Sequence, residues 1–220
     1  MATCGVLDLG LQPYQKVLTL QRTLISQLKE GLASNTLILC SHPPVITIGK
    51  SGKASSIKED TASLNEQGVA IFEVERGGDA TYHGPGQIVG YPLLDLNPIR
   101  RDVGWYVRTL EQVIIATLAD FGVAGTLISG KTGVWVAHDD EARKIASLGV
   151  KLSRWCTMHG FSCNVLNCQD GFRLINPCGM PEVRTTSIEE ETGVVIPLAE
   201  VALSLSRHFL ELFEFNREEQ

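Results

Sequence analysis

The chain has 220 residues, 44% of them hydrophobic and 20% charged, which is typical of one soluble globular domain. A net charge of −6 at pH 7 argues against nucleic acid or an anionic membrane as the main partner, and no apolar run approaches the ~18 residues of a membrane span. The N-terminus shows no secretory or transit signal, and the six cysteines contain no Cys-x-x-Cys, so we expect reduced thiols in a cytoplasmic protein.

The first predicted elements are a helix and a bent pair of strands. Apolar residues at steps of three and four predict a helix over 13–32. Two short apolar runs, 36–40 and 45–49, flank a proline pair and predict either a bent hairpin or a corner. A further strand is expected over 69–74.

The middle of the chain combines a proline-containing strand with a capped helix. Because Pro92 cannot donate to a ladder, 91–96 is predicted as an edge strand. Asp102 is predicted to cap a helix that runs to Phe121, with Gly122 as its stop.

Strands dominate the second half, and a helix follows them. Strands are expected at 133–136, 144–150 and 158–165, with a polar hairpin turn at 137–143 between the first two. A last helix begins near Leu198, and the charged tail 214–220 is expected to fray. These elements predict a single α+β domain over 1–220, a mixed β-sheet with packed helices, although the last part is also compatible with a small appended subdomain.

The run 76–87 reads RGGDATYHGPGQ and concentrates the binding signals of the chain. Apolar segments precede and follow it. Its four glycines allow positive φ and close approach of backbone N–H groups to a ligand. Twelve residues are too many for a tight hairpin, so this run is predicted to be a binding loop.

Cys178 and Lys144 are the candidate catalytic residues. Cys178 lies between Pro177 and Gly179, on a stiff turn, where a nucleophile and an inert core thiol both remain open. The N–H of Gly179 would be free to face an oxyanion. Lys144 opens an apolar strand, where it is either a solvated strand end or the partner of a thiol, whose ordinary pKa of about 8.5 it would lower. With its own pKa lowered, it would serve as a proton acceptor.

Two histidines stand beside glycines, and each either polarises a carbonyl or bonds within the sheet: His83 and His159. The group His159, Cys163 and Cys168 invites a zinc interpretation, but its spacings match no compact ligand pattern, and no metal is predicted. Neither a Gly-x-Gly-x-x-Gly fingerprint nor a P-loop occurs, and no cofactor is predicted.

Four stretches, at 76–87, 143–150 (RKIASLGV), 159–165 (HGFSCNV) and 175–179 (INPCG), together resemble the lipoyl(octanoyl) transferase family, the octanoyl-[acyl-carrier-protein]–protein octanoyltransferases. The segment 42–49 is also similar to the first strand pair of that family. The resemblance covers nearly the whole chain, in family order.

The resemblance implies the biotin/lipoate protein ligase-like fold and a transfer of octanoate without ATP. It implies octanoyl-acyl carrier protein as donor, and lipoyl domains of 2-oxoacid dehydrogenases and the glycine cleavage H protein as acceptors, with a monomeric enzyme. Cys178 would carry the acyl group as a thioester, and Lys144 would lower the pKa of its thiol. The acyl site would be lined by Arg76, Gly77, Gly78, Asp79, Ala80, Thr81, Tyr82, His83, Ser147, Leu148, Gly149, Gly160, Phe161 and Ser162.

Two further expectations concern the oxyanion and the acyl chain. Backbone N–H groups of Gly179 and of the Gly77-Gly78 pair are expected at the oxyanion, and Leu148, Val150 and Phe161 are expected to form a narrow tunnel. The competing interpretations are an ATP-dependent lipoate or biotin protein ligase of the same fold, a non-catalytic module that binds acyl carriers or lipoyl domains, and a cysteine hydrolase that releases octanoate.

Overall fold

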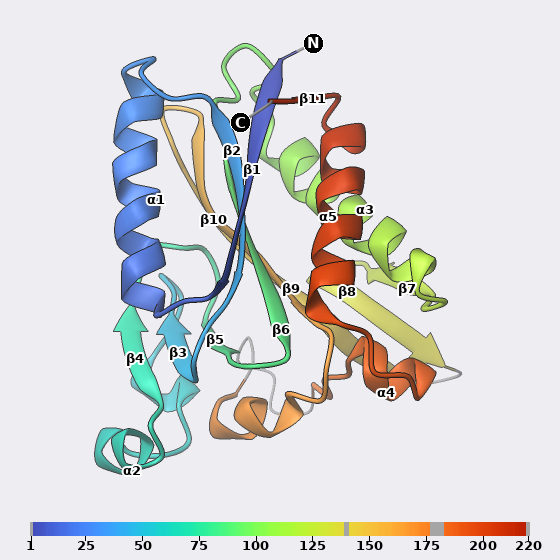
Figure 1. The fold of residues 1–220 in the computed structure, drawn as a ribbon. Helices are drawn as coiled ribbons and strands as arrows, with labels where there is room; N and C mark the ends of the chain where they lie inside the picture. Colours follow the sequence, from blue (N-terminus) through green and yellow to red (C-terminus); the bar gives the residue numbers. More distant parts are fainter. Residues whose placement is uncertain (1, 139–140, 177–182, 219–220) are drawn as a thin grey trace.

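A computed structural model describes residues 2–138, 141–176 and 183–218 (Figure 1). Within these ranges the backbone forms one eight-stranded and one three-stranded sheet, both with parallel and antiparallel neighbours, so the predicted α+β class with a mixed sheet is confirmed. The large sheet contains, from edge to edge, β11 (Asn216–Arg217), β1 (Thr3–Leu11), β2 (Asn35–Ser41), β6 (Gln87–Leu93), β10 (Cys156–Asn164), β9 (Glu141–Ser153), β8 (Lys131–His138) and β7 (Gly125–Ile128). The small sheet contains β4 (Ala70–Glu73), β3 (Val45–Ile48) and β5 (Ala80–His83).

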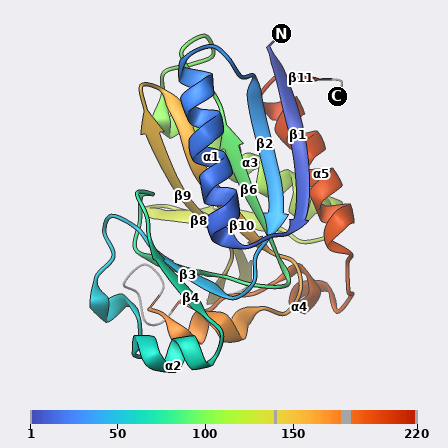
Figure 2. The ribbon, with the colours of Figure 1, turned by 60° about the vertical axis from the view of Figure 1, so that its left-hand side comes forward.

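Helices cover both faces of the large sheet. Helix α1 (Tyr14–Lys29) lies on one face, while α3 (Val103–Asp120) and α5 (Leu198–Leu212) pack together on the other (Figures 1 and 2). The shorter elements lie toward the lower end of the molecule in Figure 1, with α2 and η2 against the small sheet and α4 below α5: η1 (Ala54–Ser56), α2 (Thr61–Glu66), η2 (Gln169–Leu174) and α4 (Ile188–Thr192).

Local signals set the ends of α3. The side chain of Asp102 accepts a hydrogen bond from Trp105 N at 2.9 Å, which satisfies one of the free N–H groups of the first turn. The helix stops before Gly122, which adopts a φ of +77°. Both predicted helix signals are therefore confirmed, and the last predicted helix also begins at Leu198, as expected.

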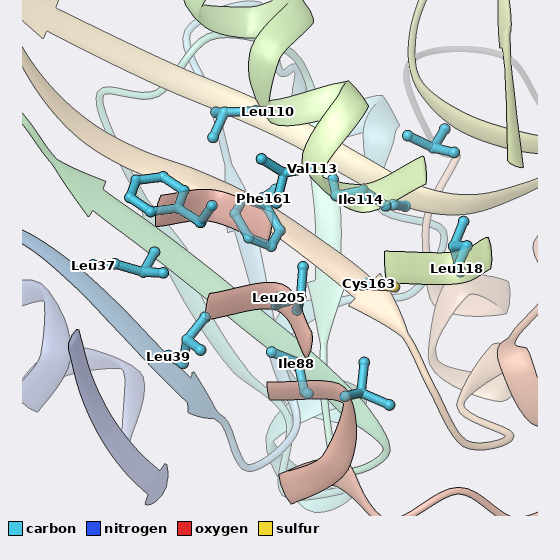
Figure 3. Close-up of a cluster of buried hydrophobic side chains, with 14 of the residues drawn as sticks. Leu37, Leu39, Ile88, Leu110, Val113, Ile114, Leu118, Phe161, Cys163 and Leu205 are labelled. Carbon is cyan, nitrogen blue, oxygen red and sulfur yellow. The ribbon is translucent and has the colours of Figure 1, made fainter. Parts of the chain in front are cut away.

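The core explains why β2 is apolar at each position from Leu37 to Cys40. Leu37 and Leu39 point to the face covered by α3 and α5, whereas Ile38 and Cys40 point to the face covered by α1. Figure 3 shows part of the first of these clusters, to which α3, α5 and strands β1, β2, β6, β8, β9 and β10 contribute side chains. Because both faces are covered, the strand reads as a continuous hydrophobic run.

The corner alternative for 36–49 is confirmed, because β2 and β3 belong to different sheets. The predicted hairpin pairing is confirmed, but the turn bounds 137–143 are wrong, because β8 runs to His138, β9 begins at Glu141, and the two strands pair antiparallel up to these residues. Residues 76–87 are not one continuous loop, since β5 occupies part of the run and pairs antiparallel with β3. The tail is also partly ordered into β11, which pairs with β1.

The prediction that Pro92 marks an edge strand is wrong, because β6 pairs with β2 and β10 in the middle of the large sheet. The ladder to β10 stops at the pair Phe161 and Gly90, just before the proline. Beyond the gap, the Thr157 hydroxyl donates to Pro92 O at 2.7 Å and accepts from Leu94 N at 2.9 Å. A side chain thus replaces the ladder bonds that the proline cannot make.

Candidate active site

A cavity of about 570 Å³ opens between the small sheet and strands β9 and β10. It collects residues from the glycine-rich run 76–83, from β9 and from β10 that are far apart in sequence. Every predicted acyl-site residue except Tyr82 lines this cavity, and so does Lys144. Cys178 lies outside the described residues.

Arg76 is a buried clamp for the glycine-rich run. Its guanidinium donates to Thr47 Oγ1 at 3.1 Å, to Thr47 O at 2.6 Å and to Gly77 O at 2.9 Å, and the residue is 7% exposed. It passes between two glycines: a Cβ on Gly49 would lie 2.8 Å from Arg76 Nη1, and one on Gly149 2.9 Å from its Cδ. These contacts fix the wall of the cavity from behind.

Backbone hydrogen bonds attach the same run to its neighbours. Gly77 N donates to Val150 O at 2.9 Å, so the expectation that the Gly77 N–H faces an oxyanion is wrong. Gly78, with a φ of +83°, accepts at its carbonyl from Ser51 N. The side chain of Asp79 bonds Ser56, and Ser56 O accepts from Asn176 N at 2.8 Å. The run is thereby connected to the segment that leads toward Cys178.

Tyr82 turns away from the cavity. Its ring lies in the space left by two glycines, since a Cβ would approach it to 2.3 Å on Gly84 and to 2.0 Å on Gly171. It meets Phe172 edge to face, with ring centroids 5.9 Å apart, in a small core beneath the three-stranded sheet. The alternation of side chains along β5 accounts for this direction, because Tyr82 alternates with Thr81 and His83, which line the cavity.

His83 is a buried, neutral side chain at one wall of the cavity. Burial, reinforced by the neighbouring His42 and Arg76, lowers the pKa of His83 to about 3. Its Nδ1 lies 3.3 Å from Gln87 Oε1, and its ring stacks with that of Tyr14 at a centroid distance of 6.3 Å. Of the two roles left open by the sequence, the observed contacts are those of a histidine bonded within the fold.

His159 lines the cavity from β10 in a left-handed conformation, with a φ of +59°. Its backbone N donates to Gln21 Oε1 on α1 at 3.1 Å. Its ring is 2% exposed, and among the described residues neither ring nitrogen has a hydrogen-bond partner. Burial lowers the pKa of His159 to about 4, so its 3.7 Å approach to the carboxylate of Glu75 is not an ion pair at neutral pH.

Lys144 is buried in the wall of the cavity, with 4% exposure, and is not a solvated strand end. Its Nζ lies 5.2 Å from the centre of the Trp135 ring. Its backbone is held on both sides, because Lys144 N donates to Arg184 O at 2.8 Å and Lys144 O accepts from Thr186 N at 3.0 Å. The chain that returns after residues 177–182 therefore pairs directly with this lysine.

All five described cysteines are buried and carry raised thiol pKa values. Burial raises the pKa of Cys4, Cys40, Cys163 and Cys168 to about 12, and it also raises that of Cys156. None of these thiols is ionised near neutral pH. In the described part of the chain no group of three or more His, Cys, Asp or Glu side chains is arranged to hold a metal ion.

Several cavity residues lie outside any sequence motif. They come from α1, β6, α3, the turn before β8 and the start of β8: Tyr14, Val89, Tyr91, Val107, Gly130, Lys131 and Thr132. Each reads in the sequence as an ordinary core or surface residue, and only the packing of distant elements brings them to the cavity. Among the described residues no helix is long and apolar enough to cross a membrane.

Solved structures with the same arrangement of elements are protein ligases for lipoate and biotin. A lipoate protein ligase from Thermoplasma acidophilum superposes with a TM-score of 0.75 at 15% identity, over 100% of this chain and 86% of that one. Biotin protein ligase from Aquifex aeolicus, in complex with biotin and ATP, gives 0.57 at 14% identity, over 97% and 71%. The predicted ligase-like fold class is confirmed.

The sequence comparisons define the family. Residues 13–210 match the family described as lipoyl protein ligase A/B catalytic domain, and the chain belongs to this family. A relative named octanoyltransferase in Solibacter usitatus is 45% identical over 98% of this chain and 95% of its own length. One from Myxococcus xanthus is 42% identical over 99% of this chain, which spans only 61% of that protein. By this relationship the chain is an acyltransferase.

Proposed function

We propose that the chain transfers octanoate from octanoyl-acyl carrier protein to a specific lysine of lipoyl domains, through a thioester on Cys178. The observation that carries the proposal is Lys144: a lysine with 4% exposure in the wall of a cavity lined by the resemblance motifs. The cavity volume of about 570 Å³ falls in the range of about 300–1,000 Å³ that small-ligand sites occupy. We further propose that residues 1–220 act as one monomeric catalytic domain in the cytoplasm.

The proposed chemistry needs no energy source besides the donor thioester. The Cys178 thiolate attacks the octanoyl carbonyl carbon, the carbon–sulfur bond of the donor breaks, and the departing thiolate takes a proton from the Lys144 ammonium. The acceptor lysine amine then attacks the Cys178 thioester, its carbon–nitrogen bond forms, and Cys178 leaves as thiolate. The proton that the amine releases returns to Lys144, which restores the starting state.

The neighbourhood of Lys144 supports this pairing. Arg184 and Thr186, which hold its backbone, lie six and eight residues after Cys178, and Asn176, bonded to Ser56, lies two residues before it. The described thiols are neutral and buried, which leaves Cys178 as the candidate nucleophile.

The relatives favour octanoyl transfer over the ATP-dependent ligase alternative. The relatives at 42–45% identity are named octanoyltransferases, whereas the ligases share the fold at only 14–15% identity. Acceptor modification by octanoyl-acyl carrier protein without ATP would support the transferase. Modification that requires ATP and a free acid would support the ligase.

Intact-protein mass after mixing with octanoyl-acyl carrier protein tests the nucleophile. We expect an octanoyl adduct on the wild type and on the control Cys168→Ala, and no adduct on Cys178→Ala. An adduct of unchanged yield on Cys178→Ala would refute the thioester on Cys178. Release of octanoate to water, with the acceptor left unmodified, would identify a hydrolase instead.

The reactivity of the Cys178 thiol distinguishes the proposed enzyme from a non-catalytic binding module. We expect Cys178 to be alkylated rapidly near neutral pH and more slowly in Lys144→Ala. An inert Cys178 in the wild type would support the binding module.

A further inference from the structure

Trp135 lies directly behind Lys144. It is the cross-strand partner of Lys144 in the β8–β9 ladder, and it is 2% exposed. The Lys144 Nζ is 5.2 Å from the ring centre, within the ~6 Å over which an ammonium is attracted to the negative face of an aromatic ring. Trp135 does not line the cavity, so any influence on the reaction must pass through the cavity residues in contact with its ring, Lys144 and Lys131.

The missing side chain of Gly133 leaves the space through which the Lys144 side chain runs. Gly133 has a φ of +121° next to the irregularity in the β8–β9 register, and a Cβ on it would lie 2.5 Å from Lys144 Cε. Its N–H donates to the buried carboxylate of Glu111 on α3 at 3.0 Å. The Lys144 side chain therefore passes over Gly133, whose backbone is held by the hydrogen bond to Glu111. The ring of Trp135 then limits the positions that the Lys144 ammonium can take.

We propose that Trp135 is the positioning residue of the Lys144 ammonium, an inference that rests on the proposed function of Lys144. A buried ammonium has lost much of its hydration, and the face of an indole ring replaces part of it. A lysine side chain also has four rotatable bonds, so one fixed contact near its end restricts the positions of Nζ. The ring thus stabilises the charged form at the place where a proton must be given up and recovered.

A second lysine uses the same ring from the outer side of the site. Lys131 Nζ lies 5.6 Å from the ring centre, and the indole N–H of Trp135 donates to Lys131 O at 3.3 Å. This bond, together with the burial of the ring, fixes the orientation of the indole. The geometry gives Trp135 a rigid position, as a positioning residue requires.

Variants that keep the shape of the ring test the proposal best. Site-specific incorporation of 4,5,6,7-tetrafluorotryptophan at position 135 removes the negative face without creating a cavity. We expect kcat for octanoyl transfer to fall about 10- to 30-fold, with little change in the KM for the donor. The pH at which Cys178 becomes half-reactive toward iodoacetamide should rise. Trp135→Phe, which retains a negative ring face, should lie between the wild type and Trp135→Leu.

Trp105 provides a matched control. It also has a cation over its ring, Arg100 at 5.7 Å, but it packs against Phe213 away from the cavity. Tetrafluorotryptophan at position 105 should leave both kcat and the alkylation profile unchanged. Wild-type kcat and profile with the fluorinated ring at position 135 would overturn the proposal, as would equal effects at both positions.

The variant Lys144→Met distinguishes a failure of the proposed function of Lys144 from a failure of the positioning role of Trp135. If Lys144→Met retains full octanoyl transfer, the proposed function of the lysine fails, and the role of Trp135 fails with it. If Lys144→Met is inactive while the fluorinated Trp135 enzyme behaves as wild type, only the positioning role is refuted.

Discussion

Mild acid should destabilise this protein through buried histidines, because burial lowers the pKa of His42, His83 and His159. Burial lowers the pKa of His83 to about 3 and that of His159 to about 4, from an ordinary value of 6.5. Between each native pKa and the ordinary value of 6.5, the histidine is protonated in the unfolded chain but neutral in the native state. The free energy of unfolding therefore falls as the pH decreases below 6.5. From pH 7 to pH 5, His83 and His159 should each cost about 2 kcal/mol of unfolding free energy, about 4 kcal/mol together.

Urea unfolding at pH 7 and pH 5 measures this loss. His83→Gln should reduce the difference between the two pH values by about 2 kcal/mol, whatever its effect at pH 7, because glutamine does not titrate. If wild type and His83→Gln lose the same free energy between pH 7 and pH 5, the proposed burial of a neutral His83 is wrong.

Three further predictions follow from the walls of the cavity. Arg76→Met should lower the free energy of unfolding by about 3 kcal/mol in urea titrations, because the buried hydrogen bonds to Thr47 are lost. The control Arg22→Met, at an exposed arginine, should change it by less than about 0.5 kcal/mol, and equal effects of the two variants would contradict the clamp. Phe161→Ala should shift preference toward acyl chains longer than octanoyl in competition between donors, and an unchanged preference would remove Phe161 from the tunnel wall. Tyr82→Ala should cost about 3–5 kcal/mol of stability yet keep the chain-length preference, since its ring faces away; a shifted preference would count against that orientation.

Local patterns were sufficient to predict elements whose causes are local. Asp102 and Gly122 define α3 because capping and a left-handed stop depend on neighbouring residues only. Strand β1 was not predicted, because Gly5 and Gly10 interrupt its apolar pattern and its partners come from β2 and from the end of the chain. The location of Pro92 in a central strand depends on Thr157, 65 residues away, which no local rule indicates.

The motifs predicted which segments meet, but not what each side chain does there. The runs 76–83 (except for Tyr82), 147–149 and 160–162 line one cavity, as their predicted shared role would require. Within the first run, the Arg76 guanidinium donates to Thr47 behind the cavity wall, and the Tyr82 ring points to the other side of the small sheet. Motif membership could not show these directions, because they depend on glycines 49, 84, 149 and 171, which open space for the two side chains from other parts of the fold.

The proposed role of Lys144 requires a lysine that is buried and held in one place, and residues remote in sequence bury it and hold it. Trp135 and Gly133 come from the neighbouring strand, and the 184–186 segment returns to bond the backbone of Lys144. Before residues 177–182, Asn176 is bonded to Ser56, whose hydroxyl donates to Asp79 in the glycine-rich run. The described residues that flank 177–182 are thus bonded to the glycine-rich run on one side and to the backbone of Lys144 on the other.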